Sequence, residues 1–370
     1  MTERHRAIRE ARALILQYGW NSTCYQILNE GIERWWSEDS RALVGFVRSG
    51  TMAIVAGAPV CAADRLAETI QAWERFVAKE GLRVCYFGAE GRLQSCLSQD
   101  PAYVQVILGA QPEWKPDEFV AAVDGDASLR AQLHRASNKG VQVSEWNRDR
   151  AENNPDLDRV LRDWLSTRGL PTLHFLVEPE TLGNLQDRRI FVAKLDGAPV
   201  GFVTLCPIPA QNGWLTEQFV RSKWAPNGTV ELMLYEAARA VALDQDSYFT
   251  MGIVPLVSPD GAAQDSEPGW LRFLRRWAKA HYVRFYNFRG LSEFKTKFHP
   301  VRWQPVVVIV RDSRFRFGHF RAIGGAFTQG MPELAVVAGV LKAGAAEFIR
   351  FGHLFFSGFQ VKSPITGKRR

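Results

Sequence analysis

The chain has 370 residues, of which 46% are hydrophobic, 12% aromatic and 23% charged. This composition excludes a disordered chain and supplies a large core, which at this length indicates two domains or slightly more. The net charge of +7 and the isoelectric point near 9.2 favour an anionic partner such as RNA, a phospholipid surface or a phosphorylated substrate. An ordinary basic enzyme would show the same charge.

Cysteine usage and hydropathy bear on the compartment. The five cysteines are scattered and contain no Cys-x-x-Cys pair and no metal-type His/Cys spacing, which predicts reduced thiols and no metal site. Residues 1–12 are polar and lack the apolar core of a secretory signal. No run of about 18 uncharged apolar residues occurs, so no transmembrane helix is predicted and we expect a cytoplasmic protein.

The first part of the chain alternates strands and helices. Apolar residues at helical spacing predict a helix over 3–18, and a Ser49-Gly50 turn between apolar runs predicts a hairpin. The further predicted elements are a helix over 64–80, strands over 84–87 and 103–108, and a polar connection over 112–126. This alternation predicts an α/β lobe that spans residues 1–142.

A basic helix over 129–140 closes this lobe. Arg130 and His134 are four residues apart, Arg135 lies beside them, and Gly140 supplies a stop signal. The basic face is either simply solvated or in contact with phosphate groups. Arg130 and Arg135 are therefore candidate substrate-binding residues.

The second half repeats the order hairpin, helix, strand. An Asp196-Gly197 turn separates two apolar runs, which is typical of a hairpin. The predicted elements are a helix over 157–167, strands over 190–195, 200–205 and 214–219, a helix over 230–243, a strand over 249–254, a helix over 270–281 and a strand over 306–310. The shared order predicts a duplicated α/β unit, with the second copy at residues 143–312.

Residues 313–370 form a tail of different character. The apolar residues on one helical face are Leu334, Val337, Leu341, Ala345, Phe348, Phe351 and Phe355. Charged side chains occupy the other face, and the chain ends in aromatic and basic residues. An amphipathic helix of this kind lies in a bilayer interface or packs on protein, so a membrane-associating tail is one of two interpretations.

Several motifs of the second half resemble a known family. They are Ala225-Pro-Asn-Gly-Thr-Val-Glu231, Met251-Gly-Ile-Val-Pro255, Tyr286-Asn-Phe-Arg-Gly-Leu291 and Phe294-Lys-Thr-Lys-Phe-His-Pro300. They resemble the lysyl-phosphatidylglycerol synthase C-terminal domain, which is the catalytic part of the multiple peptide resistance factor family. Related segments in the first half are Tyr18-Gly-Trp-Asn-Ser-Thr23, Gly57-Ala-Pro59 and the basic helix, so the resemblance covers residues 10 to 312.

This resemblance implies tandem acetyltransferase-like (GNAT) domains that move an aminoacyl group from aminoacyl-tRNA to phosphatidylglycerol. It implies two partners, the charged tRNA and a phospholipid, and a peripheral position at the inner face of the cell membrane. The flippase region of the best-known members is absent from this sequence, and their Gly-Asp-Pro reads Gly57-Ala58-Pro59. Relatives without that region load amino acids onto sterols or small molecules, so a small-molecule acceptor stays open.

The chemistry of such a transfer requires few groups. An aminoacyl ester is already activated, so the enzyme positions an acceptor, removes its proton and stabilises the oxyanion, without a cofactor. Glu217 and Glu231 flank the Asn227-Gly228 turn and are candidate bases or anchors for the amino group. Alternatively, Glu217 is a surface acid at a strand edge, and Glu231 favours the dipole of the helix it begins. Lys295 is the third candidate catalytic residue, with a solvated basic edge as its alternative.

The backbone amides of residues 227–229 precede a helix and could bind an oxyanion or phosphate, while Thr229 or Asn227 could also act as an N-cap. The candidate substrate-binding residues are Arg221, Asn227, Gly228, Thr229, Asn287, Gly290, Lys297, Arg130 and Arg135.

Two other functions remain open. The segment from Arg321 through Gly324 to Ala326 fits the Arg-x-x-Gly-x-Ala pattern of acetyl-CoA-dependent N-acyltransferases, but it lies some ten residues beyond the last predicted strand. A non-catalytic module that binds lipid or RNA through its basic face is the second.

Overall fold

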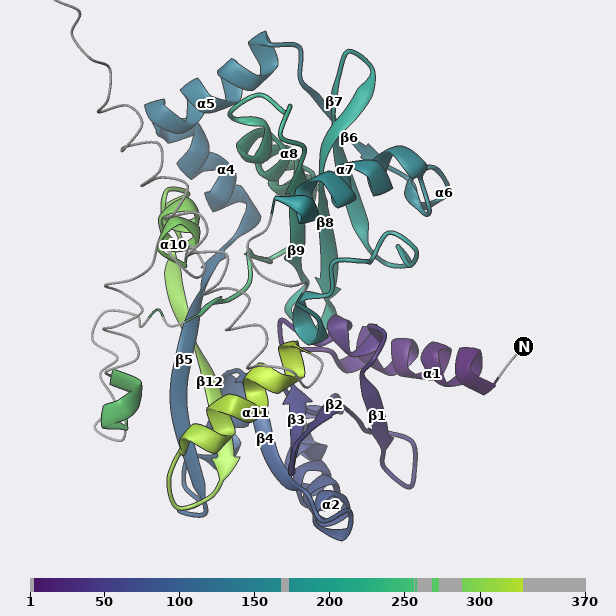
Figure 1. Ribbon diagram of the computed structural model, residues 1–370, viewed down its shortest axis with the longest axis vertical. Coiled ribbons are helices and arrows are strands. Elements are labelled where there is room, and N and C mark those ends of the chain that lie inside the picture. Colours follow the sequence, from purple (N-terminus) through teal and green to yellow (C-terminus); the bar gives the residue numbers. More distant parts are fainter. Residues whose placement is uncertain (1–2, 168–172, 256, 258–267, 273–287, 329–370) are drawn as a thin grey trace, which may run out of the picture.

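The computed structural model describes residues 3–167, 173–255, 257, 268–272 and 288–328 (Figure 1). The helices and strands of the first half are α1 (Glu3–Tyr18), β1 (Glu33–Trp36), β2 (Leu43–Ser49), β3 (Met52–Ala56), α2 (Leu66–Lys79), β4 (Arg83–Ala89), α3 (Gly91–Leu97), β5 (Tyr103–Trp114), α4 (Pro116–Gly125) and α5 (Ala127–Asn138). Those of the second half are β6 (Gln142–Trp146), α6 (Arg148–Ala151), α7 (Pro155–Ser166), β7 (Arg189–Leu195), β8 (Ala198–Ile208), β9 (Gly213–Arg221), α8 (Thr229–Leu243), β10 (Tyr248–Thr250), β11 (Val254–Pro255), α10 (Phe288–Thr296), β12 (Arg302–Arg311) and α11 (Phe317–Phe327). The predicted α/β class is confirmed.

A single mixed sheet joins the two halves. The strand order is β1-β2-β3-β4-β12-β5-β10-β9-β8-β7-β6, and β11 pairs with β5 off this path. The last strand, β12, lies between β4 and β5 and is antiparallel to both, although the sequence groups it with the second unit. In Figure 1, β5 and β12 run side by side between the upper and lower parts of the molecule. The two halves are therefore joined by strand pairing, because β12 of the second half hydrogen-bonds to two strands of the first.

Local signals predict several elements correctly. The helix expected over 3–18 is α1, and the two hairpins are β2–β3 and β7–β8. Asp196 and Gly197 have φ of 50° and 82°, which is the left-handed backbone that a tight hairpin turn requires.

Two predictions of local structure are wrong. The expected connection over 112–126 is the end of β5 followed by α4, which begins with Pro116 in its first turn. Phe119 and Val123, four residues apart, are buried there, but Lys115, Asp117 and Glu118 before them and Asp124 after them make the segment look polar in the sequence. The strand expected over 249–254 is split into β10 and β11, because Gly252 has a φ of 71°. Most of the helix expected over 270–281, and the tail beyond residue 328, lie outside the described residues.

The junction between the halves is part of the core. α1 lies across it in Figure 1, and Ile15 of this helix is fully buried in a cluster that includes Ile54 of β3 and Leu215 of β9. Burial of each such side chain contributes roughly 2 kcal/mol to the stability of the fold, so these contacts fix the two halves relative to each other. None of the helices in the described ranges is long and apolar enough to cross a bilayer.

Candidate active site

A cavity of about 250 Å³ lies at the junction of the two halves, and we call it the central cavity. Its polar lining residues include Ser22, Thr23, Glu90 and Gln111 from the first half and Thr216, Glu217, Gln218 and Lys295 from the second. Two of the three candidate catalytic residues therefore face one cavity from separate elements. The structure places Glu217 on β9 and Lys295 on α10.

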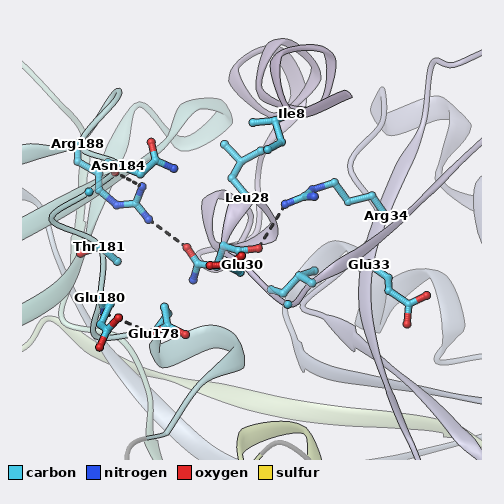
Figure 2. Close-up of a pocket in the computed structure, with 14 residues that line it drawn as sticks. Ile8, Leu28, Glu30, Glu33, Arg34, Glu178, Glu180, Thr181, Asn184 and Arg188 are labelled. Atoms are coloured by element: carbon cyan, nitrogen blue, oxygen red, sulfur yellow. Dashed lines mark hydrogen bonds between the residues drawn. The ribbon is translucent and has the colours of Figure 1, made fainter. Parts of the chain in front are cut away.

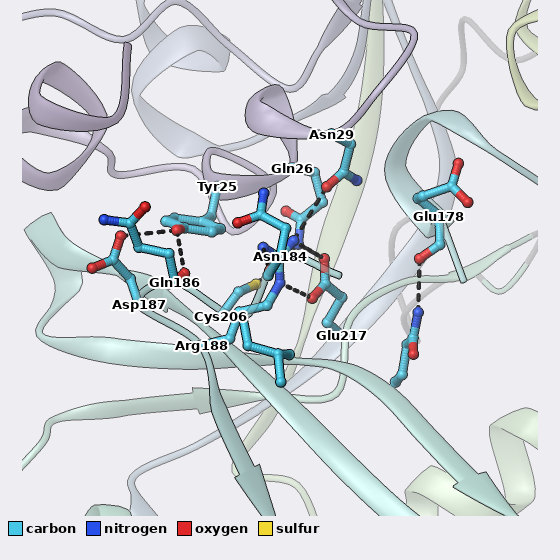
Figure 3. Close-up of polar contacts among 12 residues, drawn as sticks. Tyr25, Gln26, Asn29, Glu178, Asn184, Gln186, Asp187, Arg188, Cys206 and Glu217 are labelled. Atoms are coloured by element: carbon cyan, nitrogen blue, oxygen red, sulfur yellow. Dashed lines mark hydrogen bonds and ion pairs between the residues drawn. The ribbon is translucent and has the colours of Figure 1, made fainter. Parts of the chain in front are cut away.

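Glu217 is buried in an ion pair, so it is not a surface acid. Its Oε2 accepts from Arg188 Nε at 2.7 Å and its Oε1 from Arg188 Nη2 at 2.9 Å, with side chains 2% and 1% exposed (Figure 3). Gln26 Nε2 donates to Glu217 Oε1 at 3.2 Å. Burial lowers the pKa of Arg188, but the adjacent Glu217 carboxylate outweighs this effect and raises it above its ordinary value. Arg188 therefore stays charged, and three acceptor positions of Glu217 are occupied.

Lys295 is also buried, which rules out a solvated basic edge. Its Nζ donates to the backbone carbonyls of Met251, Gly252 and Ile253 at 2.6, 2.8 and 3.2 Å. Burial lowers the pKa of the Lys295 ammonium to about 7, while three carbonyl oxygens favour the charged form and oppose that shift. Lys295 thus ties α10 to the segment between β10 and β11 and brings a positive charge to the central cavity.

Glu90 is a functional candidate that the motifs missed. It directly follows β4, is 3% exposed, and accepts hydrogen bonds from the Ser22 backbone N–H at 3.0 Å, from Ser22 Oγ and from Gln111 Nε2 at 3.2 Å. Burial raises the pKa of Glu90 to about 7, although the Ser22 and Gln111 hydrogen bonds act in the opposite direction. The available signal was an acidic residue between glycines at the end of an apolar strand.

The raised pKa of Glu90 makes stability depend on pH. A carboxyl group with a folded pKa of about 7 against an ordinary 4.5 stabilises the fold at low pH, and this contribution disappears as pH rises through 7. Relative to the wild type, Glu90→Gln should therefore gain up to roughly 3 kcal/mol between pH 4.5 and pH 8. Urea unfolding of both proteins at the two pH values measures this difference, and an equal pH response in both would contradict it.

A second cavity, of about 410 Å³, adjoins the first, and we call it the basic cavity. It shares the walls Trp164 and Phe219 with the central cavity. The candidates Arg135, Arg221, Asn227, Gly228 and Glu231 all line it. The structure thus brings together four of the nine predicted substrate-binding residues and the catalytic candidate Glu231, from α5, β9, the loop after β9 and the start of α8.

Glu231 and Lys297 form an ion pair beside the basic cavity. Lys297 Nζ donates to Glu231 Oε1 and, at 3.2 Å, to Gln132 Oε1. The same Nζ lies 4.2 Å from the ring centroid of Phe294. The charge of Glu231 is therefore balanced by that of Lys297, and the ion pair helps to fix the position of the Lys297 side chain.

The turn before α8 is built around Gly228. This glycine is the N-cap residue with a φ of 94°, and no side chain caps the helix, so neither Asn227 nor Thr229 has the capping role considered above. Thr229 Oγ1 instead donates to the carbonyl of Pro226 at 2.7 Å.

Gly228→Ala should lower the free energy of unfolding by about 3 kcal/mol or more, because of positive φ and overpacking. A Cβ atom at Gly228 would lie 2.0 Å from the Gln132 carbonyl oxygen. Gly125→Ala is the control, since its Cβ would meet open space, and should change stability by less than about 1 kcal/mol. Equal unfolding midpoints for the two variants would contradict the close approach of α5 to this turn.

Two candidates lie elsewhere, and a third is outside the described residues. Arg130 is exposed, donates to the Asp124 carbonyl and lines neither cavity. Gly290 is on α10, also outside both cavity linings, and Asn287 is outside the described residues.

A third cavity, of about 550 Å³, is lined by Arg188 (Figure 2). Four carboxylates, Glu30, Glu33, Glu178 and Glu180, line it together with Arg34 and Arg188. Arg188 therefore lines this acidic cavity, while its partner Glu217 lines the central one.

Two alternative chemistries find little support here. Within the part of the chain that the structure describes, no three His, Cys, Asp or Glu residues are grouped as metal ligands. The Arg321–Ala326 pattern lies inside α11 rather than in a loop after a strand. Amides in the middle of a helix bond to carbonyls one turn back and are not free to bind a pyrophosphate.

Comparison with known proteins is consistent with this architecture. The C-terminal domain of an Agrobacterium fabrum protein named after lysylphosphatidylglycerol synthetase superimposes with a TM-score of 0.73 at 18% identity, covering 88% of this chain and 98% of that one. The L-PGS of Bacillus licheniformis gives 0.72 at 21% identity, covering 88% and 96%. At these identities the likeness shows the fold alone.

An uncharacterised protein of Corynebacterium glutamicum is 24% identical over 284 residues, which are 72% of this chain. The match spans about a third (34%) of that relative's length. The model of the family described as phosphatidylglycerol lysyltransferase, C-terminal, matches residues 12–310. This match covers most of the chain, including every element that lines the two adjoining cavities apart from α11, and the chain belongs to that family.

Proposed function

We propose that the protein is an aminoacyltransferase that moves an amino acid from aminoacyl-tRNA to a hydroxyl, or an amine, of a membrane lipid such as phosphatidylglycerol. The observation that carries this proposal is the pair of adjoining cavities. One is lined by buried Glu217 and Lys295, the other by Arg135 and Arg221, and the two share Trp164 and Phe219. Family membership supports the same general reaction.

The sizes and charges of the cavities suit different parts of the substrates. About 250 Å³ is below the roughly 300–1,000 Å³ of pockets for drug-sized ligands, so the central cavity suits one amino acid rather than a nucleotide. Arginine side chains bind phosphate oxygens well, which makes the basic cavity a suitable place for a phosphate of the tRNA end or of the lipid headgroup. The reacting ester would then lie near the wall that both cavities share.

The hydrogen bonds that Glu217, Lys295 and Glu231 make within the protein indicate a different role for each of them. Arg188 and Gln26 occupy three of the about four acceptor positions that a carboxylate offers, so Glu217 has one position left to anchor the substrate's α-ammonium group. Lys295 supplies positive charge near a developing oxyanion. Glu231 orients Lys297 at the basic cavity. No cofactor is needed, because the ester is already activated.

Arg135→Ala should raise the KM for charged tRNA by about 5–10-fold and reduce the salt dependence of binding by about one counterion. The physical reason is the loss of a guanidinium that lines the basic cavity. Arg130→Ala is the matched comparison, since Arg130 is on the same helix but lines neither cavity. If both variants raised KM equally, the whole helix rather than the cavity would bind the phosphate.

Transfer and tRNA-binding assays of two variants distinguish an enzyme from a binding module. Glu217→Gln and Glu231→Gln keep the shape of both side chains, and Gln avoids an empty space beside buried Arg188. For an enzyme, transfer from charged tRNA to phosphatidylglycerol liposomes should fall while tRNA binding persists. A wild-type protein that binds tRNA and liposomes without any transfer would instead be a binding module.

A further inference from the structure

Among the described residues, three ionisable side chains line the central cavity, and they differ in how many of their hydrogen-bonding positions neighbouring groups occupy. Glu217 is paired with Arg188, and the Lys295 ammonium donates to three carbonyls. In Glu90, all three hydrogen bonds end on Oε1. Within the described ranges, no group donates to Glu90 Oε2 and no cation pairs with this carboxyl. Glu90 therefore has one free oxygen at a cavity wall.

The rest of Glu90 is held firmly. It is the N-cap residue of α3, and Ser22 fixes Oε1 through both its backbone and its hydroxyl. Behind it, Gln111 Nε2 also donates to Tyr248 Oη at 3.2 Å, and Tyr248 Oη donates to Glu113 Oε1 at 2.7 Å. A side chain fixed on one oxygen and open on the other is oriented for a reaction in the cavity.

We propose that Glu90 is the general base of the transfer and accepts the proton of the attacking hydroxyl on Oε2. This inference rests on the proposed function. The hydroxyl oxygen forms a bond to the ester carbonyl carbon, and its proton passes to Glu90. The bond from that carbon to the ribose oxygen of the tRNA then breaks, and the ribose oxygen takes the proton back from Glu90. The base thus comes from the first half of the chain, while Glu217 and Lys295 act from the second.

The electrostatic surroundings suit this role. A base works best when its pKa is near the operating pH, and burial raises the pKa of Glu90 to about 7. The other titratable groups around it are Lys295 and Glu217 across the cavity, Glu113 and Tyr248 behind Gln111, and Cys24. Glu217, by contrast, has both carboxylate oxygens bonded to Arg188.

The test compares Glu90→Gln with wild type in transfer from charged tRNA to phosphatidylglycerol liposomes. We expect kcat to fall about 10²–10⁴-fold with KM for the donor within threefold. Glu74→Gln is the matched control, since Glu74 is another buried glutamate of the same half, bonded to Tyr86 and Tyr103, and lines none of the three cavities. This control should keep kcat close to the wild-type value.

A pH profile tests the inference without relying on that variant. Wild-type kcat should fall on the acidic side of pH about 7, and Ser22→Ala should move this limb to higher pH, because the Ser22 hydroxyl lowers the pKa of Glu90. The inference is overturned if Glu90→Gln keeps kcat within threefold, if it raises KM alone, or if the acid limb is absent. A wild type without any transfer would instead overturn the proposed function, and the inference with it.

Discussion

Replacing Arg188 by methionine should lower the free energy of unfolding by about 3–5 kcal/mol, because it leaves a buried carboxylate without its counter-charge. The Arg188–Glu217 pair is 2.7 Å long and almost fully buried, and Gln26 alone cannot neutralise Glu217. Urea unfolding at neutral pH measures the loss. The neighbouring Arg189 provides a control, since its partners Glu145 and Asp244 are 39% and 59% exposed. Arg189→Met should change stability by less than about 1 kcal/mol.

The double variant Arg188→Met/Glu217→Met separates stability from function. Replacing both partners of a buried pair by apolar side chains is often neutral, so most of the lost stability should return. The double variant should nevertheless lack transfer, because it has lost Glu217, which lines the central cavity. An unfolding midpoint of Arg188→Met equal to that of the wild type would show that the pair carries little energy. A double variant with wild-type transfer would remove Glu217 from the site.

Lys295→Met should reduce transfer by about 10²–10³-fold. Of the described residues that line the central cavity, Lys295 has the only cationic side chain, and a positive charge there stabilises a developing oxyanion. The substitution also leaves the carbonyls of Met251, Gly252 and Ile253 without their donor. Transfer should therefore be measured well below the unfolding midpoint of the variant, with circular dichroism to establish that it is folded.

The wild-type pH profile gives an independent test of the charge on Lys295. Burial lowers the pKa of its ammonium to about 7, and three carbonyl oxygens oppose the shift, so transfer should decline as pH rises from about 7 upward. Lys295→Met should lack this alkaline limb. If the variant kept transfer within threefold of the wild type, Lys295 would be a structural tether of α10 and no more.

Much of the local structure and part of the site could be predicted from the sequence. The Asp196-Gly197 hairpin depends on residues adjacent in the chain, and α1 depends on periodic apolar side chains. Motifs likewise indicated Glu217 and Lys295, which share the central cavity, and Arg221, which lines the basic one. Signals of this kind remain readable because they are contained in short segments.

The rest depends on contacts between distant segments. The position of β12 between β4 and β5 joins strands about 200 residues apart, and no local pattern encodes such a pairing. Arg188 belongs to no motif, yet it donates hydrogen bonds to both carboxylate oxygens of Glu217. Glu90 gains its importance from Ser22 and Gln111, which only the fold brings to it. The chemical character of each candidate was therefore visible in the sequence, but its partners were not.

The most direct test of the central claim is transfer of radiolabelled amino acids from a mixed pool of charged tRNAs into a total lipid extract, with and without ribonuclease pretreatment. The account predicts a labelled lipid that ribonuclease abolishes, after which single charged tRNAs identify the amino acid. Ribonuclease-sensitive label in a water-soluble product would move the acceptor to a small molecule. No transfer into either fraction would contradict the assignment of the central cavity as an aminoacyltransferase site.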